Sequence, residues 1–184
     1  MPCRPRACTG STPCTRSPSS ASSTCSSAGS TGGSNSIEGG FVVTDDPDRL
    51  FDRIDVSIEA ASVDTTLEMR DEDQRSPRFF DIASFPNLTF HGEQSERVGE
   101  SAWKVLGDLA IRHVTRRVPF RVVVRGMTVD QWGQSKLAAS ATTDGARPNF
   151  DLTTELEMEW GTEGGPDVWV QVDIEAILQQ GNAR

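Results

Sequence analysis

The sequence predicts an all-β protein whose strands enclose an apolar interior, and two observations support this prediction. Apolar side chains alternate with polar ones over several short stretches, which is the pattern of strands with one buried face. Clusters of Asp, Gly and Pro separate these stretches at the spacing of an antiparallel meander. Strands of this kind must bury their apolar faces, so the sequence favours a two-sheet sandwich or a closed barrel.

The alternation is clearest in four stretches, at 54–58, 103–111, 118–124 and 168–174. Shorter candidate strands lie at 40–44, 88–92, 135–142 and 152–160. The turns expected between strands lie at 45–48, 98–100, 130–133 and 162–166. Residues 66–84 break the pattern, because Leu67, Met69 and the charged run after them predict a short surface helix that Pro77 ends.

Residues 1–37 have a different composition from the rest of the chain. They contain 11 Ser, 5 Thr and all 4 Cys, and they carry no acidic residue. So few large apolar side chains cannot offset the entropy of ordering, and the segment is expected to be disordered and of low complexity. An excess of Ser, Thr, Pro, Arg, Gly and Cys is also what GC-rich DNA encodes in a wrong frame, so a frameshift over residues 1–37 is a hypothesis.

This N-terminal segment has no apolar stretch of the kind found in secretory signal peptides. The sequence as written therefore predicts a cytoplasmic protein, and export is expected only if the true N-terminus differs. The four cysteines show no Cys-x-x-Cys spacing and no nearby His, so a zinc site is not expected.

Charge and motifs exclude several classes of function. The net charge of −9 and pI of about 4.7 disfavour binding to nucleic acid, and no apolar run is long enough to cross a bilayer. Nucleotide-binding loops, the Gly-x-Ser-x-Gly elbow and the His-Glu-x-x-His motif are absent from the sequence. His91 and His113 are the only histidines, so no metal site is expected. These features favour a protein that is not an enzyme.

Three sequence blocks stand out in the globular part of the chain. The first is S-V-D-T-T-L-E-M-R-D-E-D-Q-R-S-P-R-F-F-D-I-A-S-F-P-N-L-T-F at 62–90. The others are G-D-L-A-I-R-H-V-T-R-R-V at 107–118 and R-P-N-F-D at 147–151. Together they resemble the signature of the bacterial YceI family. The resemblance covers about 38–184, and the family's usual first strands are not visible in front of it. It implies a lipocalin-like antiparallel β-barrel over 38–184 with a short helix, incomplete at its N-terminal strands.

The resemblance also implies binding of a polyisoprenoid or other long-chain lipid in the barrel. The bound molecule would be an isoprenoid, an isoprenoid quinone or a fatty-acyl lipid, with no further cofactor; a homodimer is compatible with the sequence. The residues expected to contact the ligand are Val56, Ile58, Phe80, Phe90, Trp103, Val105, Leu109, Ile111, Phe120, Val122, Val170 and Val172. An anionic head would meet Arg70, Arg75 or Arg112. The residues themselves favour a structural ion pair on the helix for Arg70, and a solvated outward face is the alternative for Arg112.

The function expected from these features is non-enzymatic binding, carriage or sequestration of such a lipid. One alternative is an enzyme that acts on a lipid in the same cavity, and a cavity acid or base with a shifted pKa would favour it. The other is a truncated barrel that does not close and has no function.

Overall fold

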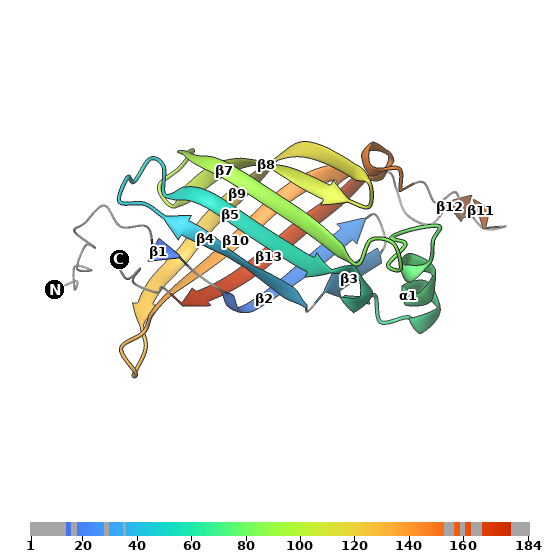
Figure 1. Ribbon diagram of the computed structural model, residues 1–184, viewed down its shortest axis with the longest axis horizontal. Coiled ribbons are helices and arrows are strands. Elements are labelled where there is room, and N and C mark those ends of the chain that lie inside the picture. The colour runs from blue at the N-terminus through green and yellow to red at the C-terminus, as the bar shows by residue number, and fades with distance from the viewer. Residues whose placement is uncertain are drawn as a thin grey trace.

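The computed structural model describes residues 14–15, 18–27, 30–34, 36–152, 157–158, 161–162 and 167–177. Within them the chain forms a long antiparallel sheet that curls around an apolar interior (Figure 1), as the alternation predicts. The strands of this sheet follow the order β1-β4-β5-β7-β8-β9-β10-β13-β2-β3-β6, and β11 pairs with β12 in a separate two-stranded sheet. The architecture is the lipocalin-like antiparallel barrel with one short helix that the sequence predicts.

The bounds of the elements are as follows. The strands are β1 (Cys14–Thr15), β2 (Pro18–Ser27), β3 (Ser30–Ser34), β4 (Ile37–Val43), β5 (Phe51–Glu59), β6 (Val63–Asp64), β7 (Asn87–Arg97), β8 (Ala102–Ile111), β9 (Val114–Val129), β10 (Ser135–Ala146), β11 (Glu157–Met158), β12 (Gly161–Thr162) and β13 (Asp167–Ile177). The α-helix is α1 (Glu68–Arg75), and the 3-10 helices are η1 (Ala60–Ser62) and η2 (Arg147–Phe150).

The four stretches of clear alternation lie in β5, β8, β9 and β13, and the predicted helix is α1. The predicted strand at 152–160 is wrong at Leu152, which lies in no strand, and is confirmed at Glu157–Met158. Its other residues lie outside the described residues.

The expectation of disorder over residues 1–37 is wrong for residues 18–27 and 30–34, which form β2 and β3. Strand β2 pairs with β13 from Trp169↔Ser26 to Ala176↔Pro18, and β3 pairs with β2 and β6. The physical reason is that an unpaired strand edge offers backbone N–H and C=O groups to any extended segment. Pairing therefore does not require the segment to have a large apolar face of its own. Residues 1–13 lie outside the described residues.

The core of the barrel consists of the inward faces of its strands. Phe41, Phe51 and Trp103 pack edge to face near one end, with ring centroids 5.6 Å and 6.1 Å apart. Phe90 and Phe120 meet at 4.7 Å in the middle of the same cluster. These aromatic contacts join β4, β5, β7, β8 and β9 across the interior, so the same side chains form the core and stabilise the curl of the sheet.

Two glycines leave room for the Phe90 ring. Gly92 and Gly107 stand opposite each other in the β7–β8 ladder. A Cβ atom on Gly107 would lie 2.5 Å from Cζ of Phe90 and 2.6 Å from the carbonyl oxygen of His91. Both distances are shorter than real Cβ contacts, so position 107 requires glycine.

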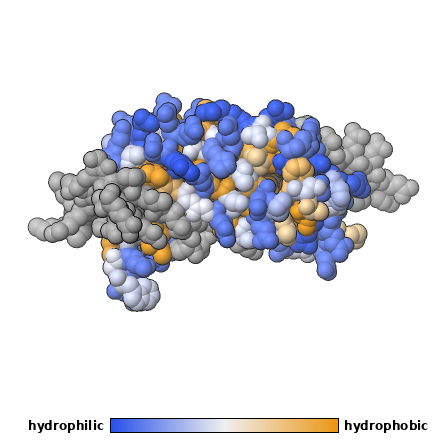
Figure 2. Space-filling model, viewed as in Figure 1, coloured by the Kyte–Doolittle hydropathy of each residue, from blue (hydrophilic) through white to orange (hydrophobic). Residues whose placement is uncertain are grey.

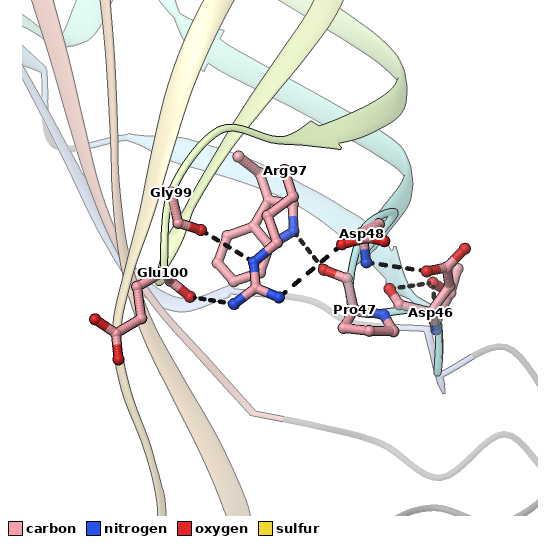
Figure 3. Close-up of polar contacts among 8 residues, drawn as sticks. Asp46, Pro47, Asp48, Arg97, Gly99 and Glu100 are labelled. Carbon is pink, nitrogen blue, oxygen red and sulfur yellow. Dashed lines mark hydrogen bonds and ion pairs between the residues drawn. The ribbon is translucent and has the colours of Figure 1, made fainter.

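A network of polar contacts closes the end of the barrel that holds Trp103 (Figure 3). Trp103 Nε1 donates to the carbonyl oxygen of Pro47 at 3.0 Å. The guanidinium of Arg97 donates to the carbonyl oxygens of Gly99 at 3.0 Å and Glu100 at 2.9 Å. The backbone N–H of Arg97 donates to the carbonyl oxygen of Asp48 at 3.0 Å. The β4–β5 turn is thereby held against the β7–β8 hairpin.

The opposite end carries α1 and η2 (Figure 1). Helix α1 is fixed by its buried Asp71, which accepts hydrogen bonds from the backbone N–H of Thr65 at 2.8 Å and from its hydroxyl at 2.6 Å. A second apolar cluster joins Phe79 and Leu152 to Phe150 of η2 at this end. In the described part of the chain no helix is long and apolar enough to cross a membrane.

The barrel has a seam between β2 and β4. Cα atoms of the two strands come within 8 Å of each other, but no ladder joins them in the described part of the chain. Strand β4 has its ladder with β5, and β1 pairs with it only at Val42 and Val43. On the side away from β5, residues 37–41 therefore have no ladder partner among the described residues.

A carboxylate network on β10 and β13 predicts a pH dependence of stability. Hydrogen bonds from Ser140 and Gln171 hold the pKa of the Asp173 carboxyl below its ordinary value, and the charge of Arg125 acts in the same direction. The stabilisation is present above the unfolded pKa and is lost as the pH falls through the lower folded pKa. We expect D173N to be less stable at pH 7 by about 1 kcal/mol and to lose less stability than the wild type between about pH 5 and pH 2.

Urea unfolding at a series of pH values measures this difference. D45N, at an exposed position of the β4–β5 turn, is the control and should follow the wild-type curve. If the unfolding free energies of D173N and the wild type fell equally steeply with decreasing pH, the prediction would be contradicted.

Candidate functional site

The barrel encloses an apolar cavity of about 140 Å³. Its wall is formed by inward residues of β4, β5, β7, β8, β9, β10 and β13. Among the described residues of this wall, Glu38 and Thr89 are the only ones with polar side chains, and the others are aliphatic, aromatic or glycine. Burying apolar atoms in such a space is favourable, so the cavity suits a hydrocarbon rather than a polar ligand.

Ten of the twelve residues predicted to contact a ligand line this cavity. They are Val56, Ile58, Phe90, Val105, Leu109, Ile111, Phe120, Val122, Val170 and Val172. Because the inward positions of a barrel form both its core and its inner wall, the period-2 pattern was sufficient to place them. Contact of these ten side chains with a lipid stays a prediction.

The other two residues do not line the cavity. The Trp103 ring packs against Phe51 in the closed end, where its indole N–H is bonded to Pro47. Phe80 stacks edge to face on Phe79 at 4.6 Å and packs on the second apolar cluster, outside the cavity wall. Trp103 lies beyond the cavity because the inner face of its strand extends into the closed end, and Phe80 lies outside it because it follows α1 and belongs to no strand. Contact of these two side chains with a lipid stays a prediction.

Sequence reasoning missed other wall residues, namely Ile37, Phe41, Phe51, Ile54, Leu88, Ala139, Ala141 and Ile174. Ile54 and Ile174 share the faces of predicted residues on β5 and β13, so the same alternation could have identified them. Ala139 and Ala141 have small side chains, so they leave cavity space that larger side chains at these positions would fill. Their cross-strand partners include Val122 and Val172, which also line the cavity.

The three arginines predicted to bind a headgroup differ in their surroundings. Arg75 donates from Nε to the carbonyl oxygen of Ala61 at 3.0 Å and from Nη2 to that of Val63 at 2.8 Å, so it holds α1 against the chain before it. Arg70 lies on the same helix. Arg112 lies in the β8–β9 turn, next to Ile111 of the cavity wall, and its Nε is buried without a partner among the described residues. Arg112 is therefore the strongest of the three candidates.

The two histidines, and the aspartates whose pKa values are shifted, lie outside the cavity wall. His91 contacts Asp55 at 2.9 Å on the outer face, and His113 lies 3.4 Å from Asp151 beyond the end of β8. The described residues contain no cluster of three or more His, Cys, Asp or Glu that could hold a metal ion. Burial raises the pKa of Asp55, but hydrogen bonds from His91 and Arg53 outweigh it and lower the pKa overall. Asp55 and Asp173, whose pKa values are lowered, are not wall residues.

The model of the YceI-like domain matches residues 17–176 of the chain. Curated relatives include UPF0312 proteins of Yersinia pestis (strain Pestoides F) and Yersinia enterocolitica. Each is 30% identical over 125 residues, which is 68% of this chain and 64% of the relative. The chain thus covers about 64% of the length of these relatives.

Solved structures share the fold. A YCEI protein of Campylobacter jejuni superimposes with a TM-score of 0.68 at 23% identity, covering 81% of this chain and 85% of that one. Burkholderia cenocepacia BcnA gives 0.67 at 15% identity, with 90% and 96% covered. A polyisoprenoid binding domain from Saccharophagus degradans, implicated in plant cell wall breakdown, gives 0.66 at 12% identity, with 89% and 98% covered.

Proposed function

The chain belongs to the family of YceI-like domains, and from this premise we propose that it binds a polyisoprenoid or another long-chain lipid inside its barrel. The proposal is supported chiefly by the apolar wall, in which 20 of the 22 lining residues that the structure describes have aliphatic, aromatic or glycine side chains. Each methylene group moved from water into such a space contributes about 0.8 kcal/mol. No catalytic group is needed for this stabilisation, and the function we propose is non-enzymatic carriage or sequestration.

The size of the cavity limits how the lipid is held. Its volume of about 140 Å³ is smaller than the roughly 300–1,000 Å³ of typical ligand pockets. A long chain must therefore displace wall side chains or move part of the wall outward. The β2–β4 seam is the wall segment that can move without breaking a ladder in the described residues. We expect the lipid to enlarge the cavity on this side.

Native mass spectrometry of the full chain, followed by organic extraction, tests the proposal. Low, narrow charge states with an added mass that extraction assigns to a lipid would support it. Folded protein that takes up no polyprenyl or fatty-acyl lipid from a mixture would contradict it. Broad, high charge states would instead support the truncated-barrel alternative.

A headgroup prediction follows from the buried Nε of Arg112. We expect R112A to weaken binding of an isoprenoid diphosphate by about tenfold or more, because a hydrogen bond to a charged group contributes about 1.5–3 kcal/mol. Binding of the matching isoprenoid alcohol should change little. Isothermal titration with the two ligands measures both affinities.

R121A is the matched control, since Arg121 is exposed and does not line the cavity. Its affinity for both ligands should equal that of the wild type. If R112A weakened alcohol and diphosphate binding to the same extent, Arg112 would not be a headgroup residue.

A further inference from the structure

The β9–β10 hairpin projects beyond the end of the barrel, at the lower left in Figures 1 and 2. The ladder reaches Ser135↔Val129, and residues 130–134 form the connecting turn. This is the closed end of the barrel, where the β4–β5 turn also lies (Figure 1). The hairpin is therefore the outermost described part of the molecule on that side.

Large apolar side chains are exposed along this projection. Trp132 in the turn is 76% exposed, Val129 is 64% exposed and Met127 is 57% exposed. Met127 is the cross-strand partner of Leu137, which is completely buried. Paired residues of a ladder lie on the same face, so Met127 and Val129 continue the inner, apolar face of the barrel past its end.

The same projection presents almost no charge to solvent. Between Met127 and Ser135 the one charged residue is Asp130. Its Oδ1 accepts the backbone N–H groups of Trp132 and Gln134, each at 2.9 Å, and its side chain is only 13% exposed. Lys136 at the base lies 4.0 Å from Asp130 and 3.0 Å from Glu175, which compensate its charge. The tip of an otherwise highly charged protein thus exposes large apolar side chains beside uncharged polar ones and presents almost no charge.

We propose that this hairpin docks the protein onto a zwitterionic lipid bilayer, with Trp132 at the level of the headgroups and Val129 and Met127 beside it. Tryptophan favours the membrane interface, where its ring is buried and its indole N–H remains hydrogen-bonded. Docking requires no exposed charge of the tip to be dehydrated. The net charge of −9 opposes an anionic surface, so a zwitterionic one fits the charge of the molecule better.

This inference is carried by the hairpin and is independent of what the cavity holds. It adds to the proposed function a surface at which a lipid-binding barrel would meet the membrane. Failure of docking and failure of lipid binding are separate outcomes, because docking is measured by flotation and lipid binding by mass spectrometry.

Flotation with phosphatidylcholine vesicles tests the proposal on the full chain. We expect the wild type to float with the vesicles and W132S to partition about tenfold more weakly, since one large aromatic side chain no longer contributes its burial. M69S is the control, because Met69 is 83% exposed on α1 at the other end of the barrel. Its partition should equal that of the wild type, and that of W132Y should lie between those of the wild type and W132S.

Adding anionic lipid should weaken partition of the wild type at low salt, and raising the salt concentration should restore it. The proposal is overturned if the wild type does not float, or if W132S floats as well as the wild type. A wild type that stays in solution as a dimer, and becomes a monomer as W132S, would assign the hairpin to self-association instead.

Discussion

G107V is expected to lose about 3 kcal/mol or more of folding free energy, a large fraction of the roughly 5–15 kcal/mol by which typical domains are stable. The valine Cβ would lie 2.5 Å from Cζ of Phe90, 2.6 Å from the His91 carbonyl oxygen and 2.7 Å from Cα of Gly92. Two of these three atoms belong to the backbone of β7, which is paired on both sides. The clash therefore cannot be relieved by turning one side chain.

G126V is a matched control for this substitution. Gly126 lies in β9, and a Cβ atom placed there meets nothing within 4 Å. Valine is also favourable in strands, so the stability of G126V should remain within about 0.5 kcal/mol of that of the wild type. Urea unfolding followed by circular dichroism compares the two variants. Equal midpoints for G107V and G126V would show that the Gly92–Gly107 contact does not limit the packing of Phe90.

The second large effect is expected from A141F, which should abolish lipid binding while the protein remains folded. Ala141 lines the cavity between Val122 and Val172. A dry cavity of about 150 Å³ accommodates a benzene molecule, so the introduced phenyl ring fits a space of about 140 Å³. The ring would fill the volume that the lipid needs, and overpacking should destabilise the fold by no more than about 1–3 kcal/mol.

A138F carries the same change on the same strand, at an exposed position. It should bind lipid as the wild type does. Lipid retained after purification, quantified by extraction and mass spectrometry, compares the two variants at equal amounts of folded protein. Full occupancy in A141F would place the ligand outside the cavity.

Most of the wall of the cavity could be predicted from the sequence, because burial in a barrel follows the period of the strand. The alternation at 54–58, 103–111, 118–124 and 168–174 corresponds to four wall strands, and ten of twelve predicted residues line the cavity. Trp103 shows the limit of this reasoning. The alternation places Trp103 on the inner face of its strand. Whether that position faces the cavity depends on where the β4–β5 turn covers the end of the barrel, and the turn contacts Trp103 itself through Pro47.

The pairing of β2 could not be predicted in the same way. Residues 18–27 contain too few large apolar side chains to indicate a buried face, and the strand forms against β13 from the far end of the chain. Local pattern carries no information about a partner that is so distant in sequence. The sequence likewise could not distinguish Arg112 from the other two candidate arginines, because the contacts of Arg75 with Ala61 and Val63 depend on the tertiary structure.

The pairing of β2 with β13 also has a consequence for synthesis of the protein. Strand β2 pairs with the adjacent β3 on one edge and with the distant β13 on the other. At a synthesis rate of about 5–20 residues per second, the edge of β2 that meets β13 stays unpaired for roughly 7–30 s. Contacts so distant in sequence form late in folding. A strand rich in valine or isoleucine would be prone to aggregate during that interval. We expect the serine-rich composition of residues 18–27 to disfavour aggregation of this edge until β13 has been synthesised and can pair with it.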